Sequence, residues 1–467
     1  MPEQTRPNIL FLFTDDQRFD TIHALGNPEI HTPHLDTLVR RGMAFTNAYI
    51  MGGSCPAVCM PSRAMLMTGR TLYHLEAQGQ AIPEEHTLLG EALQAAGYVT
   101  FGTGKWHNGP RAYARSFTAG AEIFFGGMDD HWNVPACDFD PTGRYDNARP
   151  FIRDPFATNQ VTYRHVDHVQ PGKHSSELFS EAAVAFLNSY RDAAPFLMYV
   201  SFMAPHDPRT MPREFLDMVD AASLDMPPNF APQHPFDNGE LTVRDELLAG
   251  FPRTPEEIRR HNAEYYAMIS HLDLQIGRIL EALDRRGWRD NTIIVLAGDN
   301  GLAIGRHGLM GKQNLYDHSL HVPLLMCGPG IPAGHRTDTY AYLLDIYPTL
   351  CDLAGVPIPD TVEGRSLVPA LHHQATRVRK SLWFAYRNCQ RAVQDDRYKL
   401  IEYVVEGQRT TQLFDLQQDP WEVRNLAGDP ALASTVARLR EQLADRSGEL
   451  DDDQPDQGQD FWAGFAG

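Results

Sequence analysis

The chain has 467 residues, of which 42% are hydrophobic and 10% aromatic, and its 41 basic and 60 acidic side chains give a formal net charge of −19. This length and composition predict a globular protein with one large domain and a smaller one. The acidic balance argues against nucleic acid and against an anionic membrane surface as partners, and no apolar run is long enough to span a bilayer.

The six cysteines show neither the spacing of zinc ligands nor a dense disulfide framework. The spacing of Cys55 and Cys59 leaves open, as a minor alternative, that these two cysteines form a redox pair or bind a metal. The first six residues are polar and contain no secretory signal. We therefore expect a cytoplasmic protein, although a periplasmic protein whose signal has been removed would have the same sequence.

Apolar runs alternate with helical patterns over the first 375 residues. The runs have the length of strands that are buried on both faces of a parallel sheet, and they lie at 8–13, 98–103, 195–202, 292–297 and 321–327. The helical patterns lie at 32–42, 87–96, 176–190 and 254–287. This alternation predicts an α/β fold with a large mixed, mostly parallel sheet and helices on both faces.

The remaining segments follow other patterns. Residues 110–172 and 207–255 lack periodicity, so we expect surface loops there, partly facing a substrate. Short, partly alternating runs lie at 382–384, 391–394, 398–404 and 412–415, and a helical pattern starts at Asp429. They predict a small antiparallel sheet packed with a helix. The expected domains are a catalytic domain at 1–375, a subdomain at 376–450 and a mobile acidic tail at 451–467.

Polar side chains follow four of the predicted strands. These side chains are Asp15 and Asp16, Lys105 and His107, His206, and Asp299 and Asn300. The carboxyl ends of parallel strands meet at one edge of a sheet, which is where such sheets bind ligands. The carboxylates and the amide offer only oxygen ligands, a set that favours Ca²⁺ or Mg²⁺ over zinc.

The stretch Cys59-Met60-Pro61-Ser62-Arg63 precedes an apolar helical run. Pro61 is suited to a first helical turn and Gly69 to a helix C-cap, which puts Cys59 at a helix N-terminus. Free N–H groups and the helix dipole favour anions there, so we expect an acidified, reactive thiol. Arg63, one turn later, would face the same point.

From residue 8 to about 430 the chain resembles a type I sulfatase of the alkaline phosphatase superfamily. The motifs that carry the resemblance are Asp15-Asp16, Cys59-Met60-Pro61-Ser62-Arg63, Gly104-Lys105-Trp106-His107, Ala204-Pro205-His206, Asp299-Asn300-Gly301 and His307-Gly308-x-x-Gly311-Lys312. The resemblance implies that Cys59 is converted to formylglycine by a maturation enzyme. It also implies a metal site made by Asp15, Asp16, Asp299, Asn300 and modified Cys59, for Ca²⁺ or Mg²⁺.

The resemblance also implies roles for the other motif residues. Arg63 and Lys105 would hold the nucleophile, and His107 would be the base that releases sulfate from the formylglycine diol. Lys312 and His206 would hold the sulfate group, and one of them would protonate the leaving oxygen. His131 and His307 are candidate substrate contacts, with a solvated loop and a purely structural role as the respective alternatives.

The sequence thus predicts a sulfatase that hydrolyses a sulfate monoester, on a sulfated carbohydrate by analogy with bacterial relatives. The expected partners are a sulfated small molecule or saccharide and the formylglycine-generating enzyme, without nucleic acid or membrane. One alternative is a phosphonate monoester or phosphodiester hydrolase of the same superfamily. Another is an inactive binding protein on the same fold. The sugar, the sulfated position and the oligomeric state stay open.

Overall fold

The computed structural model describes residues 6–152, 154, 156–372, 377–454 and 458–466. Its large sheet has eight strands: β1 (Asn8–Thr14), β2 (Met43–Phe45), β5 (Val99–Lys105), β6 (Ala119–Phe124), β11 (Phe196–Ser201), β12 (Thr292–Gly298), β13 (Leu324–Cys327) and β14 (His335–Thr337). Their order is β14-β2-β13-β12-β1-β11-β5-β6, and only the two pairs made by β13 are antiparallel. The prediction of a mixed, mostly parallel sheet is confirmed.

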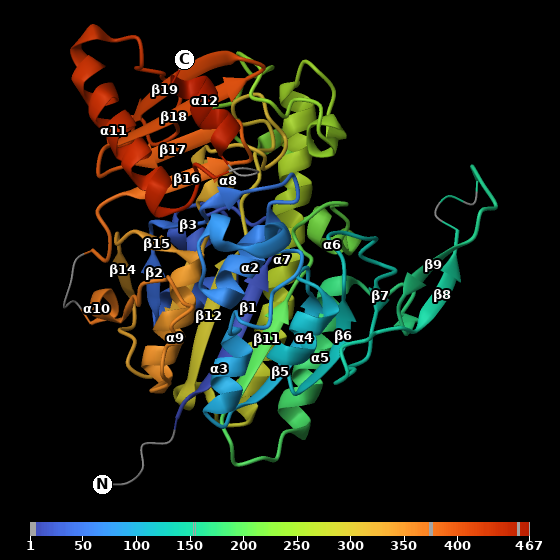
Figure 1. The fold of residues 1–467 in the computed structure, drawn as a ribbon. Helices are drawn as coiled ribbons and strands as arrows, with labels where there is room; N and C mark the ends of the chain where they lie inside the picture. Colours follow the sequence, from blue (N-terminus) through green and yellow to red (C-terminus); the bar gives the residue numbers. More distant parts are fainter. Residues whose placement is uncertain (1–5, 153, 155, 373–376, 455–457, 467) are drawn as a thin grey trace.

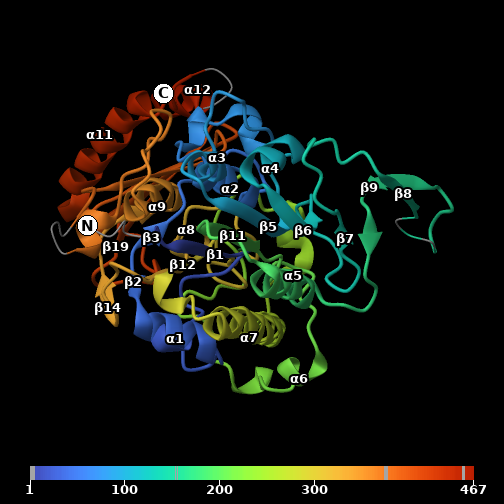
Figure 2. The same ribbon diagram turned by 90° about the horizontal axis from the view of Figure 1, so that it is seen from below.

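Helices cover both faces of this sheet, as Figure 2 shows. One face carries α1 (Pro33–Arg41), α5 (Ser175–Ser189) and α7 (Pro255–Arg285), and the other carries α2 (Cys59–Thr68), α3 (Leu89–Ala95), α4 (Pro110–Ser116) and α9 (Ile346–Ala354). Because both faces are covered, every residue of β1 and β12 is buried, which explains their unbroken apolar sequences.

The small sheet contains β16 (Leu382–Tyr386), β17 (Gln390–Gln394), β18 (Tyr398–Val405) and β19 (Gln408–Asp415), all paired antiparallel as predicted. Helix α11 (Ala433–Glu449) packs against it. Figure 1 shows that this sheet lies beyond the carboxyl ends of the parallel strands of the large sheet.

A fifth strand joins the small sheet from far upstream. This strand, β4 (Gly52–Gly53), pairs in parallel with β16, with Gly52 opposite Ala385. Gly52 has a φ of 104°, and a Cβ atom there would lie 2.0 Å from the Ala385 carbonyl oxygen, so only glycine fits. The chain just before Cys59 is therefore part of the small sheet, a link that the sequence did not reveal.

Two expectations are wrong in part. Residues 110–172 are not only loops, because β6 forms an edge of the large sheet, and β8 (Ala148–Phe151) and β9 (Thr162–His165) make a hairpin that projects from the molecule (Figure 1). The acidic tail is not simply mobile: α12 (Gln459–Ala466) contacts β18, and buried Asp452 accepts two hydrogen bonds from Arg391.

The other elements are short. They are β3 (Ala48–Tyr49), β7 (Pro135–Ala136), β10 (His168–Val169), β15 (Ala341–Tyr342), α6 (Arg213–Leu216), α8 (Asp317–Leu320) and α10 (Val368–Leu371). Among the described residues, none of the helices combines the length and apolarity needed to cross a membrane.

Candidate active site

Cys59 is the first residue of α2, at the helix N-terminus that the sequence predicts, and Gly69 ends the helix in a left-handed conformation. Its side chain is 2% exposed, and its Sγ lies 3.4 Å from His107 Nδ1 and 3.6 Å from Lys105 Nζ. Burial raises the pKa of the thiol, although Lys105 and Lys312 oppose that shift. The expectation of an acidified thiol is therefore wrong, because desolvation outweighs the nearby cations.

The acidic side chains predicted to share a site do lie together, because β1 and β12 are adjacent parallel strands and both end here. The Asp16 backbone N–H donates to Asp299 Oδ1 at 3.0 Å, and Asn300 Nδ2 donates to Asp16 Oδ1 at 2.6 Å. One oxygen of Asp15, one of Asp299 and the Cys59 sulfur all lie within 4.8 Å of one another.

Three cations balance these carboxylates. Arg63 donates through Nε to Asp299 Oδ2 at 2.9 Å and places Nη2 3.6 Å from Asp15. Lys105 pairs with Asp15, and Lys312 pairs with Asp16. All six side chains are buried, so their mutual attraction is little screened by water.

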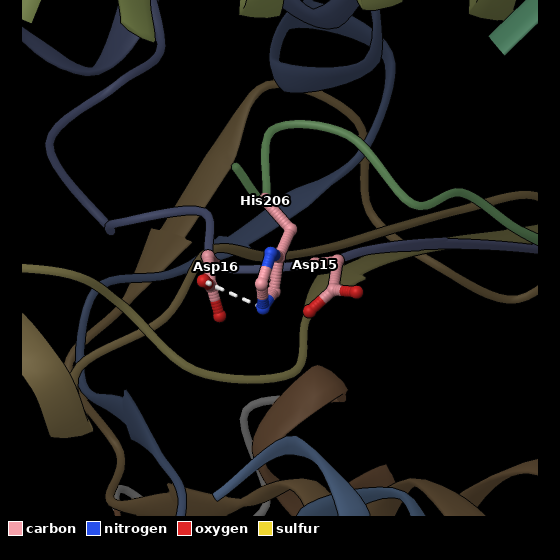
Figure 3. A group of neighbouring side chains, drawn as sticks. All are labelled: Asp15, Asp16 and His206. Atoms are coloured by element: carbon pink, nitrogen blue, oxygen red, sulfur yellow. Dashed lines mark ion pairs between the residues drawn. The ribbon is translucent and has the colours of Figure 1, made fainter. Parts of the chain in front are cut away.

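His206 completes the cluster from the segment that follows β11. Its Nε2 lies 3.7 Å from Asp16 Oδ2, and its Nδ1 lies 2.7 Å from the carbonyl oxygen of Asp207. Figure 3 shows the His206 ring between the carboxylates of Asp15 and Asp16. All four polar strand ends therefore meet at one point.

Burial and charge set the ionisation of the cluster. Burial disfavours the charged form of Asp15, but Lys105 and Arg63 outweigh it and lower its pKa. Burial and the charge of Asp15 raise the pKa of Asp299. Burial, reinforced by Lys105, lowers the pKa of His107 well below its usual value, which leaves the ring neutral near pH 7. Although burial opposes it, Asp16 holds the pKa of Lys312 well above its usual value.

The donor set fits a hard divalent cation. Within the described part of the chain, Asp15 Oδ1 and Asn300 Oδ1 are buried without a hydrogen-bond partner, which is costly unless a ligand takes them up. Asp15, Asp16, Asp299 and Asn300 supply only oxygen, the ligand type that Ca²⁺ and Mg²⁺ prefer.

The two other predicted histidines do not reach this cluster as substrate contacts. The His131 side chain is fully buried, with Nδ1 2.6 Å from Ser175 Oγ and Nε2 3.0 Å from the His206 carbonyl oxygen. Both nitrogens are occupied, so His131 supports the His206 loop instead. The ring of His307 stacks on Tyr316, with centroids 3.8 Å apart, and its Nε2 lies 3.0 Å from Asn229 Nδ2, which favours the structural alternative.

A residue that the sequence did not single out forms a hydrogen bond with the Asp16 backbone. Tyr265, on α7, is fully buried; its hydroxyl donates to the Asp16 carbonyl at 2.5 Å and accepts from the Arg18 N–H at 2.9 Å. Asp16 has a φ of 63°, which is unfavourable for a residue other than glycine. In the sequence Tyr265 belongs to the apolar stripe of its helix, and nothing there shows what its hydroxyl contacts.

The comparisons with known proteins agree with this geometry. The family model described as Sulfatase matches residues 7–356, and the model described as N-sulphoglucosamine sulphohydrolase, C-terminal, matches residues 305–449. An ulvan-active sulfatase of Formosa agariphila is 30% identical over 97% of this chain and 83% of its own length. The multifunctional alkaline phosphatase superfamily protein PehA of Trinickia caryophylli is 28% identical over 92% of this chain and 93% of its own.

Solved structures show the same fold. The structure of BT4656 with its substrate D-glucosamine-2-N,6-O-disulfate has a TM-score of 0.75 and 22% identity, covering 97% of this chain and 99% of that one. The phosphonate monoester hydrolase of Agrobacterium radiobacter also has a TM-score of 0.75, with 23% identity over 95% of this chain and 96% of that one.

Proposed function

The chain belongs to the sulfatase family and is a sulfuric ester hydrolase, and we propose that its substrate is a sulfated carbohydrate and that it acts through formylglycine made from Cys59 and a bound Ca²⁺ or Mg²⁺ ion. The observation that carries the proposal is the convergence of Cys59, three carboxylates and three cations at the ends of the parallel strands. The relatives named for ulvan and for glucosamine disulfate support the choice of carbohydrate.

The charge balance suits an anionic substrate. Asp15, Asp16 and Asp299 carry as many charges as Arg63, Lys105 and Lys312 when all six are ionised, so a divalent cation would make the site positive. Such an ion supplies Lewis acidity and lowers the pKa of a hydroxyl bound to it. Lys312 stays cationic and can bind the sulfate oxygens as negative charge develops on them.

Two histidines have the positions needed for proton transfer. His107 Nδ1 lies 3.4 Å from the residue 59 side chain, and its depressed pKa keeps it neutral and able to accept a proton. His206, whose Nε2 lies 3.7 Å from Asp16 Oδ2, is the candidate to donate a proton to the leaving oxygen. Hydrated formylglycine would supply two hydroxyls on one carbon, one to attack sulfur and one whose deprotonation releases sulfate.

The experiment has two parts. Mass spectrometry of the peptide that contains Cys59 distinguishes the thiol from the aldehyde, and co-expression with a formylglycine-generating enzyme supplies the maturation partner. Desulfation of a panel of defined sulfated sugars then tests the substrate class. Activity on aryl sulfates with none on any sugar would refute the carbohydrate proposal.

The second candidate is hydrolysis of a phosphonate monoester or phosphodiester, which the likeness to the fold of the phosphonate monoester hydrolase favours. The same cation site and the same cationic side chains would bind a phosphoester. Side-by-side kcat/KM values for 4-nitrophenyl sulfate and for a matched 4-nitrophenyl phosphonate separate the two candidates. We expect the sulfate ester to be the better substrate.

A further inference from the structure

A cavity of about 800 Å³ lies beside the start of α2, the helix that begins with Cys59. It lies outside the charged cluster, which is formed by Asp15, Asp16, Asp299, Arg63, Lys105 and Lys312. We call it the lateral cavity. Three segments line it together with Ser54: residues 72–73 and 75–78 after α2, the turn Arg387–Asn388 between β16 and β17, and Gln459–Asp460 at the start of α12. The cavity therefore depends on the small sheet and on the C-terminal helix.

The lateral cavity lies near Cys59 along the chain. Ser54 is five residues before Cys59, a span of at most about 18 Å even in an extended chain. The Ser54 carbonyl accepts a hydrogen bond from Gln78 on the cavity wall, and the Pro56 carbonyl accepts one from Gln313, the neighbour of Lys312. The segment 54–57 thus connects the cavity wall to the charged cluster.

The backbone of the cavity wall is held in an unfavourable conformation. Ala77, Gln78 and Arg387 have φ values of 45°, 57° and 44°, in the left-handed region that side chains disfavour. Such conformations persist where the surroundings impose them, often at ligand sites. Here the Arg387 N–H donates to the Gly53 carbonyl at 2.8 Å.

The polar groups in the cavity suit hydroxyls better than anions. The amides of Gln78 and Asn388 offer both donors and acceptors. The charge of Arg387 is matched by Glu240, with which it pairs. Glu76 and Asp460 also line the cavity; both are exposed, and neither forms an ion pair within the described part of the chain.

We propose that the lateral cavity is a subsite for an uncharged, hydroxyl-rich sugar unit joined to the sulfated one. The proposal rests on the proposed function and narrows its substrate class. Amides and carboxylates would bind the hydroxyls of a neutral ring, whereas the two free carboxylates would repel a second sulfate or a uronate. The enzyme would then desulfate sparsely sulfated chains in preference to densely sulfated ones.

The test compares three substrates: 4-nitrophenyl sulfate, a singly sulfated disaccharide from the panel, and the same disaccharide with a second sulfate on its other ring. In the native protein we expect kcat/KM to be about tenfold higher for the singly sulfated disaccharide. The double variant Glu76→Gln with Asp460→Asn should reduce that preference about fivefold. Raising the ionic strength should reduce it too, because salt screens exposed charges.

Two further variants complete the design. Asn388→Trp, which fills the cavity, should lower kcat/KM for the disaccharide at least about tenfold more than for 4-nitrophenyl sulfate, which has no second ring. Glu441→Gln removes an exposed carboxylate of α11 that does not line the cavity, and it should leave the preference unchanged.

The outcomes separate this inference from the proposed function. Equal kcat/KM values for the two disaccharides, or a preference that the double variant leaves unchanged, would overturn the subsite while the sulfatase activity stands. No hydrolysis of 4-nitrophenyl sulfate by the mature protein would instead count against the catalytic proposal itself.

Discussion

Removal of the Tyr265 hydroxyl should weaken cation binding through the backbone of Asp16. In Tyr265→Phe the Asp16 carbonyl and the Arg18 N–H each lose a hydrogen-bond partner, and both residues are at most 1% exposed. A buried polar group left unsatisfied costs about 1–3 kcal/mol. Together the two groups cost about 2–6 kcal/mol, which the chain can reduce by letting Asp16 leave its left-handed conformation.

That relaxation moves a proposed metal ligand, so it should appear in the dissociation constant of the ion. Loss of support behind a ligand typically weakens metal binding about 10- to 100-fold. At a Ca²⁺ concentration of 100 Kd, binding stabilises the native protein by about 2.7 kcal/mol. A tenfold rise in Kd reduces this to about 1.4 kcal/mol at the same concentration. Denaturant unfolding with and without Ca²⁺, together with calorimetric titration of the ion, measures both quantities.

Tyr266→Phe is the matched control. Tyr266 is the next residue on α7 and is 5% exposed, and its hydroxyl makes no hydrogen bond within the described residues. We expect its Kd for Ca²⁺ to equal that of the native protein. If Tyr265→Phe lowers stability equally with and without Ca²⁺ and leaves Kd unchanged, Tyr265 only supports the fold and the positioning argument is refuted.

Three other outcomes are expected. Cys59→Ser should give at most one slow turnover with an activated aryl sulfate and accumulate a sulfated protein, because serine has no second hydroxyl; intact-mass analysis that finds steady turnover without an adduct would contradict a formylglycine diol. Lys312→Ala should lower kcat/KM by about 10²–10³ in a protein that circular dichroism shows to be folded; unfolding without a specific kinetic loss would make Lys312 structural. Hydrogen bonding to Glu363 raises the pKa of His74 despite burial. His74 should therefore make the native protein more stable than His74→Gln below pH 6.5, and this difference in stability should disappear as the pH rises through the raised pKa. Urea midpoints that differ equally at all pH values would refute this.

The apolar runs and their polar ends were enough to predict the large sheet and that most of the charged side chains at the strand ends lie together. A strand buried on both faces is a continuous apolar run, and parallel strands must end at the same edge. Asp15 and Asp299 were therefore predictable neighbours although 284 positions separate them. The strands that were not expected, such as β6 with its small residues and β4 with two glycines, have no apolar run to reveal them.

The predictions failed for side chains whose role depends on a contact with a residue distant in the sequence. His131 lies in an irregular polar segment, yet Ser175 and the His206 carbonyl occupy its ring. Asp452 belongs to a run of three acidic residues, yet Arg391 holds it in the interior. The reactivity expected of the Cys59 thiol followed from the helix N-terminus alone, and the sequence did not show how completely the site is buried.

The pairing of β4 with β16 has a consequence for the order of events during synthesis. Ala385, the partner of Gly52, leaves the ribosome about 330 residues after it, which takes roughly 15–70 s at 5–20 residues per second. Until then the segment that carries Cys59 lacks the strand that anchors it. The maturation enzyme proposed above would have that interval of translation in which to reach Cys59, which the finished protein encloses almost completely.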